Sequence, residues 1–338
     1  LSVVFLKTVV QMLVVWYGFG LYGLLTGGII GGALAGAVGL ILIGKEFKAP
    51  KWKHVRQIAS FAKYATVREF TSKFYDNIDI IVITAVLGNA AVAYYSVGFR
   101  FALILTVFSS GIGVSSFPEI SRHFTQDNRE EIIRILSDGL VFTLLFAIPA
   151  TVGIVLVAER VITTLYTEQM MAAAPVAIIA VAVQLPNAVR YVFTSTTDGV
   201  DRPDVSFRAG ILLIVVNAIL DLALVPLVGI EGAAIASFVG ITLSAIYTAY
   251  ACLLELNIEW RSLALRPIAA EVVAAVTMGL SVLILDQAIR TSVLTEVVVL
   301  VAAGIIIYFV VVLTLSRGIR NRLEGILIDF VPWHGGST

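Results

Sequence analysis

The stretch from residue 60 to residue 87 is long and apolar enough to span a membrane, yet it carries charged side chains at five interior positions. On a helical wheel of 100° per residue, the polar positions fall within one half and the apolar positions occupy the other. A charge near the bilayer centre costs roughly 2.5 to 3.5 kcal/mol, so these side chains are not expected to face lipid. The pattern predicts a helix whose polar face lines a wet cavity inside a bundle. That face holds Arg68, Glu69, Ser72, Lys73, Asp76, Asn77 and Asp79.

Composition indicates the class of protein. Apolar residues make up 59% of the chain and charged residues 14%, whereas soluble domains are close to half apolar and a quarter charged. Long apolar stretches between short connectors favour helices, because a barrel would show segments of about ten alternating residues. We therefore expect an all-α fold, a polytopic transmembrane helix bundle of about ten spans. The predicted spans are residues 1–20, 25–44, 60–87, 91–117, 137–158, 172–195, 206–227, 232–254, 267–287 and 296–316.

The connectors between these spans differ in positive charge. One alternating set, counted with the adjoining span ends and the C-terminal tail, holds 16 lysines and arginines, and the other set holds only Arg160 and Arg290. Because Lys and Arg accumulate in cytoplasmic loops, we expect a multi-pass protein of the cell membrane with a cytoplasmic C-terminus. Leu1 opens in an apolar run without a basic leader, so no signal peptide is expected and the chain is interpreted as a fragment.

The sequence contains no pattern typical of an enzyme. Cys252 is the single cysteine, and the three histidines have no metal-ligand spacing. No nucleophile and base, paired-carboxylate or phosphate-loop signature is present, and the connectors are too short to hold a soluble catalytic domain. We therefore expect no catalytic activity, no cofactor, no metal centre and no nucleic-acid partner.

The third and fourth predicted spans are joined by a short uncharged connector, which predicts an antiparallel hairpin with its tip near residue 88. Counting outward from that tip, Asn77 lies level with Arg100, so Asp76 and Asp79 are expected within a turn of Arg100. An Asp and an Arg at one depth would neutralise each other and reduce the cost of desolvation. Glu69 and Lys73 are four residues apart and are also able to pair.

Two interpretations of these charges remain open. They form either an internal network that holds the helices in register, or part of a cavity that binds an anionic or polar substrate or a coupling ion. Arg190 has no acid inside its span, and its planar fork suits a phosphate; the alternative is that it extends toward the membrane surface.

Other polar positions allow either helix packing or cavity lining. Asn217 and Asp221 share one helix face, as do Lys7 and Gln11, because each pair is four residues apart. Glu271 lies near a helix end and is expected to be solvated at the membrane interface.

Small residues and prolines predict packing and bends. Close helix packing is expected where small residues recur every four positions, at Gly28, Gly32 and Gly36 and again at Gly232, Ala236, Gly240 and Ser244. Pro149 and Pro186 lie inside their spans and predict kinks.

Several stretches resemble a known family. Residues 70–100 include AYYSVGFR, which is similar to an A-x-Y-S-x-x-x-R segment at the start of the second lobe of polysaccharide and oligosaccharide flippases. PEISR at 118–122, DRPDVSFR at 201–208 and VNAILDLALVPLVGIEGAAIAS at 216–237 also resemble that family, with Asp221 where it tends to have Asn. The resemblance indicates the polysaccharide transporter (Wzx-like) family of the multidrug/oligosaccharidyl-lipid/polysaccharide exporter superfamily.

The resemblance implies two lobes of six helices, often followed by two further helices. The ten spans would then be helices five to fourteen, with a truncated first lobe and a complete second lobe. The expected organisation is residues 1–44 as the remainder of the N-terminal lobe, 45–59 as a cytoplasmic basic linker, 60–254 as the C-terminal six-helix lobe, 255–316 as two additional spans and 317–338 as a cytoplasmic tail.

The implied function is flipping of a lipid-linked oligosaccharide, carried on polyprenyl or dolichyl phosphate or pyrophosphate, from the cytoplasmic to the outer leaflet by alternating access. Membrane lipids and glycan-assembly enzymes are the implied partners, with Na⁺ or H⁺ as an open alternative for coupling. Substrate phosphate is assigned to Arg68, Lys73, Arg100 and Arg190. Charge balance or a coupling ion is assigned to Asp76, Asp79 and Glu69, and cavity lining or packing to Lys7, Gln11, Asn77, Asn217 and Asp221.

Other functions are kept as alternatives. A cation-coupled multidrug exporter of the same superfamily would use the aspartates for Na⁺ or H⁺ and would take a cationic substrate. A membrane-embedded glycosyl polymerase or ligase would need a large outer loop, and the outer connectors here are short. A scaffolding half-transporter is the third alternative.

Overall fold

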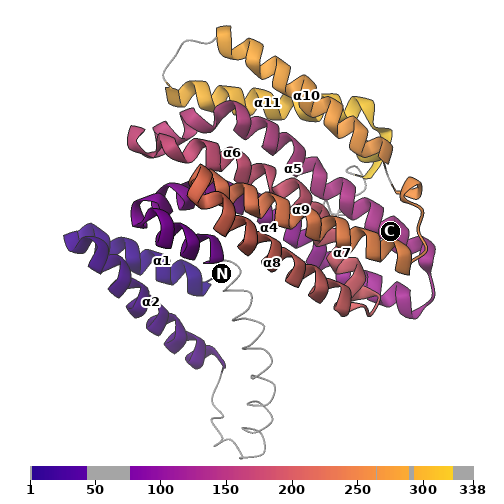
Figure 1. Ribbon diagram of the computed structural model, residues 1–338, viewed down its shortest axis with the longest axis horizontal. Coiled ribbons are helices and arrows are strands. Elements are labelled where there is room, and N and C mark those ends of the chain that lie inside the picture. The colour runs from indigo at the N-terminus through magenta and orange to yellow at the C-terminus, as the bar shows by residue number, and fades with distance from the viewer. Residues whose placement is uncertain (1, 44–76, 264, 289–292, 323–338) are drawn as a thin grey trace, which may run out of the picture. The chain divides into compact units, whose positions relative to one another are not determined.

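The computed structural model describes residues 2–43, 77–263, 265–288 and 293–322 (Figure 1). Within these ranges every regular element is helical, which confirms the predicted all-α bundle. The chain divides into two compact units, Leu1–Thr71 and Ser72–Thr338. The predictions made for Arg68, Glu69, Lys73 and Asp76 fall outside the described residues.

The first unit is a pair of helices. Helix α1 spans Ser2–Val14, a π-helical turn spans Val15–Phe19, and α2 spans Gly20–Ile43. The two helices pack closely at Gly27, where an added Cβ would lie 3.0 Å from the Cα atom of Gln11. Gly32 and Gly36 of the predicted stripe have no such neighbour within 4 Å, so the close contact lies at Gly27, beside the stripe.

The second unit is a larger helix bundle, which begins with the helical segment Asn77–Leu87. Six helical stretches among the described residues are long and apolar enough to cross a membrane: 129–165, 168–199, 203–228, 230–255, 265–288 and 295–315. The helices that follow Asn77–Leu87 are α4 (Asn89–Thr125), α5 (Arg129–Leu165), η2 (Glu168–Ala173), α6 (Ala174–Ala182), α7 (Gln184–Gly199), α8 (Pro203–Val228), α9 (Ile230–Glu255), η3 (Trp260–Ser262), α10 (Leu265–Ala288) and α11 (Val293–Leu315).

Two glycines make the sharp turns between neighbouring helices. Gly88 separates Asn77–Leu87 from α4 with φ +86°, and Gly229 separates α8 from α9 with φ +83°. Glycine adopts positive φ without the steric penalty that a Cβ imposes, which explains why each chain reversal needs one residue. The hairpin predicted near residue 88 is confirmed, and Val82 and Ile83 pack against Tyr95 across it.

The helix through residues 174–199 is broken at Val183, and this break creates α6 and α7. Pro186 lacks the N–H that would bond to the carbonyl of Ala182, so the proline removes the hydrogen bond that would carry the helix across this point. Pro149, by contrast, lies inside the continuous helix α5. Of the two expected bends, the one at Pro186 therefore falls at an interruption of the helix.

Helices α8 and α9 lie side by side along their length (Figure 1). A Cβ added to Gly232 would lie 2.6 Å from the backbone carbonyl atoms of Leu224, and one added to Gly240 would lie 3.3 Å from the carbonyl oxygen of Leu213. The Ser244 hydroxyl donates to the carbonyl of Ala209 over 3.0 Å. The small-residue stripe of α9 therefore packs against the α8 backbone, as the sequence predicts.

Helices α10 and α11 pack against each other and against α5 (Figure 1). Near the end of α10, Asp286 accepts a bidentate pair of hydrogen bonds from Arg160 of α5, one of them 3.0 Å long. Most of the other residues in the contact between the three helices are apolar. They include Val141, Leu145, Ala274, Ala275, Met278, Val282, Leu300, Tyr308 and Val312.

Candidate functional site

Three helices of the second unit bring polar side chains to Asp79. The Tyr95 hydroxyl of α4 donates to Oδ2 of Asp79, and the Ser237 hydroxyl of α9 donates to the same oxygen over 2.9 Å. The Asn217 amide of α8 donates to Ser237 over 3.2 Å. Asp221 lies one turn further along α8, and its carboxyl group experiences the negative charge of Asp79. We call these five residues the carboxylate cluster.

The carboxylate cluster has oxygen atoms that lack partners. Asp221 is fully buried, and neither of its carboxyl oxygens accepts a hydrogen bond from a described residue. The amide oxygen of buried Asn217 is unpartnered as well. Buried polar atoms are nearly always paired, so three such oxygens beside Asp79 suit a bound proton or a small hard cation. The described residues hold no group of three His, Cys, Asp or Glu, so a cation would also need amide or hydroxyl oxygens.

Arg100 does not neutralise Asp79, contrary to the sequence-based expectation. It is exposed and forms no ion pair or hydrogen bond with the part of the chain that the structure describes. The donors to Asp79 are instead Tyr95 and Ser237. Tyr95 and Arg100 are five residues apart on α4, which places them about 140° apart around the helix. The helix face that reaches Asp79 therefore carries the tyrosine and not the arginine.

Arg190 belongs to a second polar group, which we call the polar ladder. Its Nη2 and Nε atoms donate to Oδ1 of Asn187 over 2.9 and 3.2 Å, and Asn187 donates to Oε1 of Gln184 over 3.1 Å. The Thr106 hydroxyl of α4 donates to the same Gln184 oxygen over 3.0 Å. Arg190 also lies over the ring of Tyr191, 5.0 Å from its centroid. Among the described residues no carboxylate pairs with Arg190, so its positive charge is not neutralised by an ion pair.

Sequence reasoning missed Gln184 and Asn187, although both are buried. The signal that could have found them is their spacing, because positions 184, 187 and 190 recur every three residues and share one face of α7. The break at Val183 starts a new helix just before this face.

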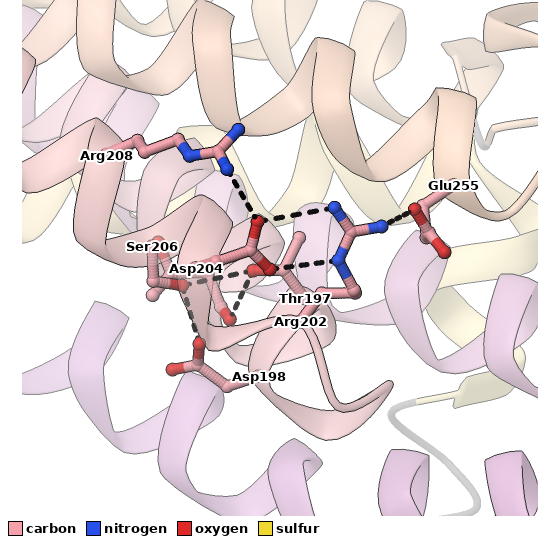
Figure 2. Close-up of polar contacts among 8 residues, drawn as sticks. Thr197, Asp198, Arg202, Asp204, Ser206, Arg208 and Glu255 are labelled. Carbon is pink, nitrogen blue, oxygen red and sulfur yellow. Dashed lines mark hydrogen bonds and ion pairs between the residues drawn. The ribbon is translucent and has the colours of Figure 1, made fainter.

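The motif DRPDVSFR forms an ion-pair network at one end of the bundle, shown in Figure 2. Arg202 donates to Asp204 over 2.9 Å and also to Glu255 at the end of α9, while Arg208 reaches Asp204 at 3.5 Å. The hydrogen bonds to Asp204, and then those to Glu255, raise the pKa of Arg202 above its usual range. The Ser206 hydroxyl donates to Asp198 over 2.6 Å. The network fastens the turn between α7 and α8 to the end of α9, which is a structural role.

Two cavities of about 590 Å³ each lie in the second unit. The first is almost entirely apolar, lies between α4, α5, α10 and α11, and is lined by residues that include Phe101, Pro149, Met278, Gly304 and Tyr308. The second is an open pocket beside the hairpin tip, lined in part by Leu87, Tyr94, Glu159, Pro175 and Glu231.

The remaining predicted positions have different surroundings. Asn77 is exposed at the start of its helical segment, Lys7 lies on α1, and Gln11 packs against Gly27. Glu271 contradicts the expectation of interfacial solvation, because it is fully buried and neither carboxyl oxygen has a partner among the described residues. Although Glu271 lies near the start of α10, its helix face packs into the contact with α5 and α11.

A bundle of apolar helices with buried ionisable groups and an unneutralised arginine defines a polytopic membrane protein of the transporter type. The chain belongs to the polysaccharide biosynthesis protein family, whose profile matches residues 1–175. The resemblance stated from the motifs is thereby confirmed.

Two curated relatives come from Haloferax volcanii. The chain is 28% identical over 330 residues to the probable flippase AglR, a match that covers 96% of this chain and 68% of the relative. It is 23% identical over 330 residues to the probable low-salt glycan biosynthesis flippase Agl15, covering 94% of this chain and 69% of that protein.

The fold is similar to that of a solved structure, the lipid II flippase MurJ in an inward closed conformation. The TM-score is 0.76 and the sequence identity is 16%, so the similarity concerns the fold. The match covers 90% of this chain and 65% of MurJ. The chain therefore spans about two thirds of the length of the proteins it resembles.

Proposed function

We propose that this chain is part of a flippase that moves a lipid-linked oligosaccharide from the cytoplasmic to the outer leaflet of the cell membrane by alternating access. The observation that carries the proposal is Arg190, a half-buried guanidinium inside the bundle that no described carboxylate neutralises. An unpaired guanidinium in a membrane interior is costly, and a phosphate or pyrophosphate offers the paired acceptors that its fork fits. The names of the two Haloferax relatives support the same function.

Arg100 is the second residue that we assign to the phosphate. It is exposed, and it makes no ion pair with a described residue that would compete with a substrate. Arg68 and Lys73 are assigned to the same role from the sequence. The apolar cavity between α4, α5, α10 and α11 would hold part of the hydrocarbon carrier, since its lining offers almost no polar group.

We assign coupling to the carboxylate cluster. Two carboxyl groups, one amide oxygen and one hydroxyl are the ligand types that a hard cation such as Na⁺ prefers, and a proton on either aspartate would satisfy the same oxygens. Binding there would connect the Asn77–Leu87 segment, α8 and α9, because α8 contributes two of the ligands and the other two elements contribute one each. Charge repulsion between Asp79 and Asp221 would be relieved by either ion.

The test is a flipping assay with the full-length protein in proteoliposomes, using a fluorescent polyprenyl-pyrophosphate oligosaccharide. We expect Arg190→Gln and Arg100→Gln each to reduce the flipping rate by about tenfold or more, the scale of a lost charged hydrogen bond of 1.5–3 kcal/mol. Arg208→Gln is the matched control, because this arginine is mostly exposed in the ion-pair network, and it should stay close to the wild-type rate.

Two outcomes would contradict the proposal. Unchanged flipping in both arginine variants would remove the phosphate assignment. Efflux of a cationic drug that depends on Asp79, without transport of the lipid-linked sugar, would favour the multidrug exporter.

The proposed orientation, with the C-terminus in the cytoplasm, is tested in the same vesicles by protease access to a C-terminal tag.

A further inference from the structure

Two acids are fully buried among the described residues of the second unit, Asp221 and Glu271. Asp221 belongs to the carboxylate cluster, whereas Glu271 has no role in the proposed transport. Its helix face on α10 continues through Ala274, Ala275 and Met278. This face packs into a single apolar cluster with Val141 and Leu145 of α5 and with Tyr308 and Val312 of α11. The carboxyl group therefore lies at a junction of three helices.

Among the residues that the structure describes, no charged group pairs with this carboxyl group. Neither of its oxygens has a hydrogen-bond partner in the described part of the chain. From α11 the titratable group that interacts with it is Tyr308, whose own hydroxyl is buried and unpartnered. On the α5 side the acid two turns before Leu145 is Asp138, which is already paired with Arg322 at 2.7 Å and with Arg134 at 3.3 Å. Arg134 also pairs with Glu131, so these charged groups pair with one another and none of them pairs with Glu271.

We propose that Glu271 is a proton-binding site, separate from the carboxylate cluster, and that its bound proton keeps α10 and α11 packed against α5. A buried carboxylate without a counter-charge is strongly disfavoured, whereas the neutral acid has a donor to offer. The unpartnered Tyr308 hydroxyl is the acceptor that the junction provides. One proton would thus satisfy two orphan groups, which a metal ion would not do because the junction supplies too few oxygens.

The proposal leads to a mechanical expectation. Loss of the proton leaves an unpaired charge between α5, α10 and α11, so the two last helices should separate from α5 when the pH rises. Tyr308 also lines the apolar cavity, so the proton site borders a space whose walls are these same helices. The inference does not depend on the identity of the transported substrate.

The first test is labelling of the full-length protein in nanodiscs with dicyclohexylcarbodiimide, an apolar reagent that reacts with protonated carboxyl groups. The acid adds across a C=N bond of the reagent to give an O-acylisourea, which rearranges to a stable N-acylurea; the acid proton ends on nitrogen and no group leaves. Mass spectrometry of the peptide that contains Glu271 should show the adduct near pH 6 and its loss toward pH 9, the range documented for buried carboxyl groups. Absence of the adduct at the lower pH overturns the proposal.

The second test separates protonation from reagent access. Glu271→Gln mimics the neutral acid, so its melting temperature should match that of the wild type near pH 6 and should not fall between about pH 6 and pH 9, whereas that of the wild type should fall. Identical pH profiles for the two proteins overturn the proposal. Tyr308→Phe keeps the ring and removes the acceptor, so the pH at which labelling is half lost should decrease; an unchanged value removes Tyr308 from the assignment.

Discussion

Ser237 and Asp79 lie 158 positions apart in the sequence, yet the Ser237 hydroxyl donates to the Asp79 carboxylate over 2.9 Å. The contact joins the first helix of the second unit to α9, and Asn217 extends it to α8. Oδ2 of Asp79 thus accepts hydrogen bonds from α4 and α9, and the Asn217–Ser237 hydrogen bond extends the contact to α8. Asp221 lies beside it, and neither of its carboxyl oxygens has a hydrogen-bond partner among the described residues, which is the basis of the ion site proposed for this junction.

The carboxylate cluster predicts ion-dependent stability. Sodium should raise the melting temperature of the detergent-solubilised protein, because a ligand that binds only the folded state stabilises it. Asp221→Asn removes one charged ligand and should abolish most of that increase. Asp201→Asn is the control, since it removes the same charge at an exposed turn with φ +61°, a conformation that asparagine tolerates. An equal sodium effect in both variants would refute the site.

The polar ladder predicts a positioning role for Asn187. Asn187→Leu removes the acceptor that fixes the Arg190 fork and leaves the guanidinium mobile. We expect the apparent KM for the lipid-linked substrate to rise by about three- to tenfold, the effect of a hydrogen bond worth about 0.5–1.5 kcal/mol, with a smaller change in kcat. Thr106→Val removes only the far end of the ladder and should have a weaker effect. A fall in kcat alone would argue for a different role.

Gly232 predicts a packing defect at the α8–α9 contact. In Gly232→Ala the new methyl group would meet the Leu224 carbonyl carbon and oxygen at 2.6 Å, so one backbone must move. We expect a loss of about 1–3 kcal/mol in the free energy of unfolding, typical of overpacking. Gly210→Ala on α8 has no atom within 4 Å of the new methyl group and should be neutral or slightly stabilising. Equal stability of the two variants would contradict the close contact.

The ion-pair network around Arg202 predicts that the α7–α8 turn is destabilised by acid and not by base. The partners of Arg202 raise its pKa. The charged guanidinium therefore stabilises the folded state at every pH below the usual pKa of arginine, and this stabilisation is lost only at extreme alkaline pH. On the acid side, the hydrogen bond from Arg202 lowers the pKa of Asp204, so this ion pair is lost only when the pH falls below the usual range of an aspartate. Proteolysis at the α7–α8 turn should therefore increase only when the pH falls below about 4, the usual value for an aspartate. Arg202→Gln should show the increased cleavage already at neutral pH, and unchanged cleavage would contradict the clamp.

The sequence predicted the fold more reliably than the site, and the reason is physical. Long apolar runs, the turn at Gly88 and the small-residue stripe of α9 are local signals, and all three correspond to what the structure contains. The partner of Asp79 depends on which face of α4 points toward it. Counting residues from the hairpin tip gives the position of a residue along α4, but it does not give the direction in which its side chain points around the helix axis. That is why Arg100 was expected where Tyr95 lies.

Burial was the other quantity that the sequence did not provide. Glu271 was expected at the interface because only its distance from a helix end was visible, whereas its exposure depends on how α10 meets α5 and α11. Asn217 and Asp221 were recognised as sharing a face, but their proximity to Asp79 required the packing of α8 and α9 against the first hairpin.

The near-contact of the α8 and α9 backbones has a consequence for motion. Gly232 lies against the Leu224 carbonyl group, and Gly240 lies against the carbonyl oxygen and side chain of Leu213, so little side-chain material separates the two helices at these points. We therefore expect the two helices, joined by the single glycine turn at Gly229, to move together as one rigid pair. We expect any rearrangement of this part of the protein to change the contacts that α8 and α9 make with their other neighbours, such as α7.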